Sequence, residues 1–153
     1  MARYTTIKAM KYLLIILSFL AISELSAQIG SPEGRWTTTD EETGKAKSVV
    51  EIYAKGGAYY GKVVEILTGN TTAVCSDCEG HKKNQPILGM VIVEDLKADG
   101  DAAGEWTGGT ILDPQKGATY RLSVWYEDKH PDVLYVRGKH WTGLYRTQEW
   151  IRE

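Results

Sequence analysis

The chain has 153 residues and a formal net charge of −2, to which the first 27 residues contribute +2. The remaining 126 residues therefore carry −4 and contain no basic run. This balance argues against nucleic acid and anionic lipid surfaces as partners, and the length suits one domain with its own core.

The N-terminal segment is typical of a cleavable export signal. Basic residues precede an apolar run from Tyr12 to Ile22, and small residues end the segment at Ala27. The run has eleven residues, well below the roughly 20 that a membrane-spanning helix needs. We expect residues 1–27 to be removed and residues 28–153 to form one domain, periplasmic or extracellular, without a membrane span.

The exported part contains about eight β-type segments, each bounded by Gly, Pro, Asn or Asp, and shows no helical period. Short turns between neighbours predict antiparallel, up-and-down order. The fold class is therefore all-β, a single barrel in which each strand pairs with the next. The expected strands are residues 34–39, 47–54, 58–67, 86–93, 104–112, 118–127, 133–139 and 145–152.

The clearest alternation of apolar and polar residues lies in residues 118–127. Tyr120, Leu122, Val124 and Tyr126 form an apolar face, and the other face, which includes Trp125, is largely polar. Period-two alternation places these sets on opposite sides of a sheet, but parity alone leaves open which side lines the barrel.

Both cysteines, Cys75 and Cys78, lie in a polar stretch, residues 68–85, that is longer than an ordinary loop. Because an exported thiol pair meets oxidising conditions, a disulfide that braces this loop is the favoured interpretation. Two alternatives stay open. One is a thiol-redox motif, although no helix follows to activate a thiol; the other is a metal site of both cysteines and His81.

Several ordered motifs resemble an exported bacterial family known as domain of unknown function 2147. The resemblance spans Gly34 to Ile151 and implies a lipocalin-like barrel without an established activity to carry over. The motifs are Gly61-Lys62, the run from Pro86 to Met90, the run from Trp106 to Pro114 with Gly117 and Tyr120, Val136-Arg137-Gly138, and the run from Arg146 to Trp150.

Gly34-x-Trp36 also resembles the first strand of lipocalins, in which the Trp closes one end of the barrel under an Arg of the last strand. The resemblance implies Arg146 for this position, with Arg137 as the reserve. A guanidinium over an aromatic ring stabilises by about 0.5–2 kcal/mol. Gly34, Trp36, Arg146 and Trp150 are thus the expected barrel-closing residues.

The abundant Tyr and Trp residues would suit an amphipathic ligand, since each joins an apolar ring to a polar group. We therefore expect a small apolar or amphipathic molecule to bind in the barrel mouth. The alternative is a barrel filled by its own side chains that acts as an interaction module in the cell envelope. The candidate ligand-binding residues are Trp106, Tyr120, Trp125 and Arg137.

No residue cluster forms a catalytic signature. The histidines are far apart in sequence, and no Ser lies in a nucleophile-elbow motif. We expect neither enzymatic activity nor a cofactor.

Overall fold

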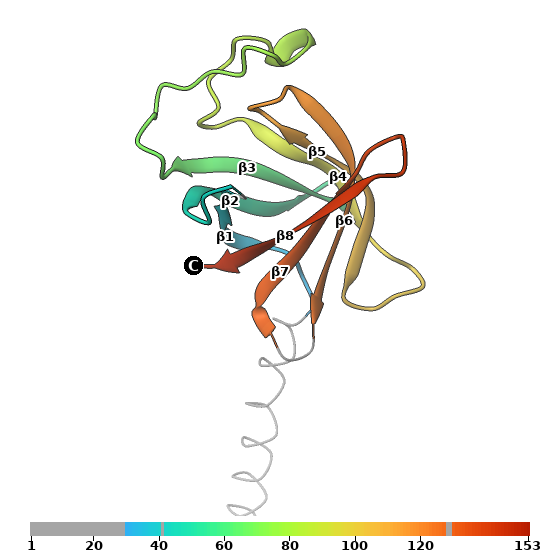
Figure 1. The fold of residues 1–153 in the computed structure, drawn as a ribbon. Helices are drawn as coiled ribbons and strands as arrows, with labels where there is room; N and C mark the ends of the chain where they lie inside the picture. Colours follow the sequence, from blue (N-terminus) through green and yellow to red (C-terminus); the bar gives the residue numbers. More distant parts are fainter. Residues whose placement is uncertain (1–29, 41, 128–129) are drawn as a thin grey trace, which may run out of the picture. The chain divides into compact units, whose positions relative to one another are not determined.

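Eight antiparallel strands, each paired with its neighbour in sequence, close into an up-and-down barrel (Figure 1). This computed structural model describes residues 30–40, 42–127 and 130–153, so the expected signal segment lies outside the described residues. The strands are β1 (Gly34–Thr39), β2 (Ala46–Lys55), β3 (Ala58–Ile66), β4 (Val91–Ala98), β5 (Glu105–Asp113), β6 (Ala118–Glu127), β7 (His130–Lys139) and β8 (Tyr145–Arg152).

The first and last strands join to close the barrel. Trp36 of β1 pairs with Arg152 of β8, and the backbone N–H of Glu153 donates to the Arg35 carbonyl at 3.1 Å. The Arg35 guanidinium also contacts the Glu153 carboxylate at 2.6 Å. This hydrogen bond and the negative charge raise the pKa of Arg35. Neither edge strand is left unpaired, which removes the usual site of edge-to-edge association.

Strand β4 differs from the prediction. It begins at Val91 instead of residue 86 and continues to Ala98. The apolar residues before it form a turn instead, in which the Met90 N–H donates to the Ile87 carbonyl at 3.0 Å, and the Gly89 N–H donates to the Val63 carbonyl at 2.7 Å. Within β4, Asp95 has a positive φ of 54°, and its carboxylate accepts a hydrogen bond from the Tyr60 hydroxyl at 2.5 Å.

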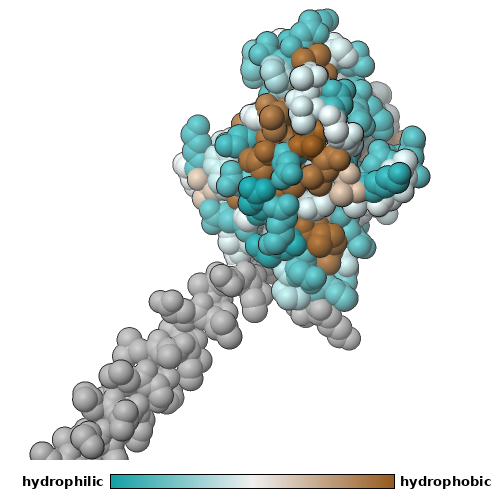
Figure 2. Space-filling model, turned by 90° about the vertical axis from the view of Figure 1, so that its left-hand side faces the viewer, coloured by the Kyte–Doolittle hydropathy of each residue, from teal (hydrophilic) through white to brown (hydrophobic). Residues whose placement is uncertain are grey.

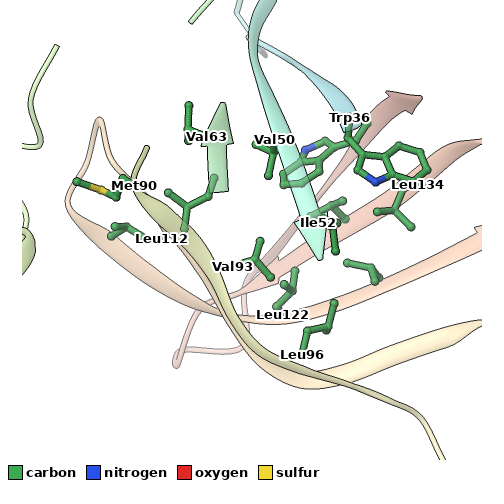
Figure 3. Packing of buried hydrophobic residues seen from close by; sticks show 14 of the residues in the cluster. Trp36, Val50, Ile52, Val63, Met90, Val93, Leu96, Leu112, Leu122 and Leu134 are labelled. Carbon is green, nitrogen blue, oxygen red and sulfur yellow. The ribbon is translucent and has the colours of Figure 1, made fainter. Parts of the chain in front are cut away.

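The barrel interior contains the apolar face of each strand. On β6 the inward set is the one that includes Leu122 and Val124, which are 2% and 1% exposed. Figure 3 shows these interior side chains converging, with Trp36 and Leu134 at one end of the cluster and Met90 at the other. The alternation on β6 was therefore predicted correctly, and the structure supplies the side that faces in.

Aromatic rings fill one end of the barrel. Trp106 lies edge-on to Tyr126 at 5.8 Å and to Tyr59 at 6.4 Å between ring centroids. Trp36 lies 6.0 Å from Tyr126 and is fully buried. Its indole N–H donates to the Pro32 carbonyl at 2.9 Å. We call this end of the barrel, which contains Trp36, Trp106 and Tyr126, the closed end.

The cation over Trp36 is Arg152, and the expectation of Arg146 was wrong. The Arg152 guanidinium carbon lies 4.2 Å from the centroid of the Trp36 ring. Its nitrogens donate to the Tyr126 hydroxyl at 2.9 Å and to the Glu33 carbonyl at 3.2 Å. Arg146 also faces inward, but it lies six residues earlier on β8 and so reaches the opposite end.

The long loop between β3 and β4 projects beyond the strands (Figure 1, green). It contains the short 3₁₀ helix η1 (Gly80–Lys82). Val74 forms an isolated antiparallel bridge with Pro86, and an ion pair between Lys82 and Glu94 ties the loop to β4. The loop is thus held in place by defined contacts.

The predicted disulfide between Cys75 and Cys78 is confirmed, with 5.4 Å between the Cα atoms. Both residues are buried, and the Cys75 sulfur lies 3.1 Å from the Pro114 carbonyl oxygen in the β5–β6 turn. The bond leaves neither sulfur as a thiolate, so the alternative metal site with His81 is wrong for this state of the protein. The disulfide instead packs the loop against the neighbouring turn.

Candidate ligand pocket

The end of the barrel opposite Trp36 is hollow. Four connections surround a pocket of about 830 Å³ there. They are the β1–β2 turn, the long β3–β4 loop, the β5–β6 turn and the β7–β8 hairpin. Turns and loops that a rigid sheet holds in place are a common location for binding sites.

The inner part of the pocket is apolar. Its residues come from several strands, and most of them also belong to the barrel core. Each is aliphatic except one Trp, so this part of the pocket offers no charge to a ligand. The apolar lining comprises Val63, Ile66, Ile92, Ile111, Leu112, Val136 and Trp150.

A hydroxyl pair adds a polar spot to the wall. The Thr38 and Ser48 hydroxyl oxygens lie 2.8 Å apart, and Thr38 is only 7% exposed. The Thr38 hydroxyl also contacts the Ser48 carbonyl at 3.3 Å. Both side chains line the pocket, and hydroxyls can donate and accept. The pair can therefore serve a polar group of either kind.

The rim is charged and contains both signs. Lys47 donates to the Gln115 side chain at 2.9 Å, and Lys116 lies 3.8 Å from the Asp113 carboxylate. On the β1–β2 turn, hydrogen bonds from the Thr43 hydroxyl and N–H hold the pKa of Asp40 below its ordinary value. These pairings fix the turns around the mouth and leave the rim polar.

The long loop forms one wall of the mouth. Thr68, Ala73 and Ile87 line the pocket, and the Ile87 N–H donates to the Ala73 carbonyl at 2.9 Å. The disulfide follows Ala73 by two residues in the chain. It therefore fixes the part of the loop that borders the pocket.

Gly117 explains how closely the loop approaches the β5–β6 turn. It has a φ of +59°, and a β-carbon there would collide with the backbone of Asp77 and Cys78. Glycine alone allows this backbone conformation without strain and leaves room for the loop. The contact places the disulfide loop directly beside the pocket mouth.

Residues 34–152 match the model of a bacterial family described as "Uncharacterized protein conserved in bacteria (DUF2147)". The chain belongs to this family. Its structure is similar to that of protein HP1028 from the human pathogen Helicobacter pylori, which is described as belonging to the lipocalin family.

That structural likeness has a TM-score of 0.68 at 20% sequence identity, and covers 80% of this chain and 83% of the other. At this identity the likeness establishes the fold. No curated protein matches the chain. The resemblance to the DUF2147 family and the lipocalin-like barrel, both expected from sequence motifs, are thereby confirmed.

Two of the four candidate ligand residues lie inside this DUF2147 barrel, at different depths. Tyr120 lines the pocket and lies 6.1 Å from the ring of His140, also a lining residue. Trp106 is 2% exposed and packs among the rings of the closed end instead of lining the pocket. Only Tyr120 is therefore in a position to contact a molecule in the pocket.

The other two candidates face outward, so their expected position in the barrel mouth requires correction. The Arg137 guanidinium lies between Trp125 and Tyr145, 4.7 Å from each ring centroid. Its Nε donates to the Thr147 hydroxyl at 2.9 Å. On β6 and β7, Trp125 and Arg137 have the parity opposite to the buried Val124 and Val136, so pleating directs them outward.

Strand β8 supplies lining residues that sequence reasoning did not assign to the pocket. Arg146, Gln148 and Trp150 all line it, and the Trp150 indole N–H donates to the Gln148 side chain at 3.1 Å. Trp150 was expected to close the barrel. Its alternation with Arg146 and Gln148 on one face is the signal that could have identified this wall.

Within the described parts of the chain, no group of three or more His, Cys, Asp or Glu residues is arranged to hold a metal ion. None of the helices in those same parts has both the length and the apolar character needed to cross a bilayer.

Proposed function

We propose that the barrel binds a small amphipathic molecule, with its apolar part in the pocket and its polar part at the rim. The observation that carries this proposal is the combination of an aliphatic interior with a rim of both charge signs. The volume of about 830 Å³ falls within the roughly 300–1,000 Å³ of small-molecule sites. Binding there removes apolar ligand surface from water.

The alternative of a fully filled barrel receives less support. Rings packed against one another occupy the closed end, whereas the space at the other end is bordered by aliphatic side chains together with Tyr120 and Trp150. A void that held only a few waters would amount to about 30 Å³ for each of them. The observed pocket is much larger.

We further propose that the protein acts outside the cytoplasm, in the periplasm or the medium, after removal of residues 1–27. The disulfide supports this location because structural disulfides persist in oxidising compartments. The experiment is to express the full chain, isolate the exported protein and determine its intact mass. Cleavage after Ala27 and the loss of two hydrogens are expected; a reduced chain that starts at Met1 would refute export.

The same exported protein allows a first test of binding. Its native mass is compared with its mass after denaturation, so that a retained non-covalent molecule is weighed directly. The purified protein is then titrated with anilinonaphthalene sulfonate, a fluorescent probe with an apolar ring system and an anionic group. We expect saturable binding with one site per chain.

Two neighbouring loop residues provide a matched pair of variants. Ala73 lines the pocket, whereas Val74 is absent from its lining and is 46% exposed. Ala73→Trp would place a large ring in the mouth and Val74→Trp would place it on the surface. We expect Ala73→Trp to weaken binding of the probe at least tenfold and Val74→Trp to leave it unchanged.

Two results would contradict the proposal. One is a wild-type protein that binds no probe and carries no extra mass. The other is equal probe affinity in both Trp variants while circular dichroism shows each to be folded, because binding would then lie outside the pocket.

A further inference from the structure

The three most exposed large hydrophobic residues in the described part of the chain lie at the tip of the β7–β8 hairpin or beside it. Trp141, Leu144 and Tyr145 are 82%, 75% and 64% exposed, and every other exposed large hydrophobic residue is below 50%. The hairpin is the red loop at the right of Figure 1. Concentrated apolar exposure of this kind marks an interaction surface.

The tip is held in a defined conformation. The His140 N–H donates to the Leu144 carbonyl at 2.7 Å, and the Gly143 N–H donates to the His140 carbonyl at 3.0 Å. The His140 ring also hydrogen-bonds the Thr142 hydroxyl at 2.9 Å and lies 5.4 Å from the Trp141 ring. Trp141 and Leu144 are thus presented to solvent by an ordered turn.

The charge of the hairpin differs from that of the whole chain. Residues 133–148 contain Arg137, Lys139 and Arg146 and no carboxylate, whereas the full sequence has a net charge of −2. Lys139, on the outer face of β7, and Arg146, exposed at the pocket mouth, flank the apolar tip on its two strands. The net charge argued against an anionic surface, but the fold gathers cations beside exposed Trp, Leu and Tyr.

We propose that the β7–β8 hairpin docks on an anionic lipid bilayer, with Trp141 and Leu144 in the headgroup region and Lys139 and Arg146 against the lipid phosphates. Trp and Tyr favour the membrane interface because their rings combine an apolar body with a polar group. Lys and Arg beside them add attraction to anionic lipid. In this proposal the hairpin lies in the membrane interface and does not cross the bilayer.

This surface adjoins the pocket. His140, Leu144, Tyr145 and Arg146 belong to the hairpin and also line the pocket. Docking would therefore bring the pocket mouth to the place where amphipathic molecules partition. The docking proposal itself does not require the pocket to be occupied.

The test uses the exported protein, shown by its mass to lack residues 1–27, because their apolar run would bind lipid by itself. Binding is measured by flotation with phosphatidylcholine vesicles that contain phosphatidylglycerol, and with pure phosphatidylcholine vesicles. We expect binding to the mixed vesicles that falls as salt is added, since salt screens the cations. Brominated lipid should also quench Trp fluorescence.

Trp141→Ser is the decisive variant, because Trp141 is highly exposed and does not line the pocket. We expect roughly tenfold weaker vesicle binding, from the apolar surface that no longer leaves water, and loss of most of the quenching. Val74→Ser is the matched control on another loop and should bind like wild type. Lys139→Gln should weaken binding to the mixed vesicles and leave binding to pure phosphatidylcholine unchanged.

Three results would overturn the proposal. They are no wild-type binding to the mixed vesicles, equal binding by wild type and Trp141→Ser, or a dimer in sedimentation that Trp141→Ser dissociates, which would assign the tip to a second copy. The proposed function is tested separately, since Ala73→Trp should lose the fluorescent probe and still bind vesicles. Trp141→Ser should bind the fluorescent probe like wild type and lose vesicle binding.

Discussion

The contact between Arg152 and Trp36 makes a quantitative prediction about stability. Arg152→Met keeps an apolar stem but removes the guanidinium, its ring contact and its two hydrogen bonds. The ring contact is worth about 1 kcal/mol in this partly buried setting. A net hydrogen bond adds about 1 kcal/mol, and more when one partner is charged. We expect the free energy of unfolding to fall by about 3 kcal/mol.

Urea unfolding of the disulfide-intact protein measures this loss. With a slope of about 2 kcal/mol per M for a domain of this size, the midpoint should fall by about 1.5 M. Arg146→Met is the matched control on the same strand and the same face. Because Arg146 is exposed at the mouth, its replacement should change stability by less than about 0.5 kcal/mol.

A double-mutant cycle with Tyr126→Phe isolates one part of the contact. The Phe variant loses the hydroxyl that accepts from Arg152, so it should show a coupling of about 1 kcal/mol with Arg152→Met. Burial raises the pKa of Tyr126, and the neighbouring Arg152 opposes that shift. The assignment of Arg152 as the closing cation would be refuted if Arg146→Met destabilised the barrel as much as Arg152→Met.

Three further predictions concern the turns around the pocket. Replacing Cys75 and Cys78 together by Ala should lower the free energy of unfolding by about 2 kcal/mol, as expected for a very short closed loop, and urea unfolding measures this loss. The same change should weaken binding of the fluorescent probe, because the loop forms a pocket wall. Unchanged affinity in a probe titration would contradict the assignment of the loop as that wall. Gly117→Ala should lower the free energy of unfolding by about 3 kcal/mol, because it adds a collision with the Asp77 backbone to the strain of a positive φ. Gly44 has a φ of +67° and open space around it, so Gly44→Ala should cost only about 1 kcal/mol. Equal losses for the two variants in urea unfolding would contradict the predicted collision. Because the pKa of Asp40 is lowered in the folded protein, its turn contributes stability above the pKa of an unfolded Asp. This stability is lost as the pH falls through the lower folded pKa. Thr43→Val should move the Asp40 pKa back toward its ordinary value, which carboxyl NMR measures, and an unchanged pKa would exclude the Thr43 hydroxyl as the main cause.

Strand existence was predictable here because the signals are local. Residues 34–39, 118–127 and 145–152 form strands with the expected bounds, since alternation and turn residues act within a few positions. The start of β4 was not predictable in this way. Pro86–Met90 is apolar, yet its backbone is fixed by a hydrogen bond from Gly89 to Val63 on another strand, which is a tertiary contact.

The candidate site was harder to predict because it depends on which face of each strand turns inward. The apolar face of β6 indicated one inward set correctly, but Trp125 was attributed to the same site from its chemistry alone. In the structure it faces outward beside Tyr135, with ring centroids 5.6 Å apart. An aromatic residue suits an outer cross-strand pair as well as a cavity, so residue type does not decide the face.

The closing Arg illustrates the same limit. Arg146 and Arg152 have the same parity on β8 and both face the interior. What separates them is their distance from Trp36, which the register of β1 against β8 determines. Register between the first and last strands of a barrel is a long-range property, so the choice of Arg152 requires the folded structure.

The distribution of ring size along the barrel accounts for the pocket. An eight-stranded barrel is just wide enough for its interior side chains to fill it, so the space left depends on the inward residues at each level. At one end these are Trp36, Trp106 and Tyr126, which pack against each other. At the other end most of them are the smaller Val, Ile and Leu, together with Tyr120 and Trp150, and the pocket lies among them.

Apolar side chains are not confined to the barrel interior. Figure 2 shows hydrophobic side chains gathered near the centre of one face, with hydrophilic ones around them.

If the hollow exists because its inward residues are small, then enlarging one of them should remove the pocket without harming the fold. Val136→Phe should therefore abolish binding of the fluorescent probe while the urea midpoint stays within about 0.5 M of wild type. A large loss of stability would mean that Val136 already fills its space and that the pocket begins nearer the rim.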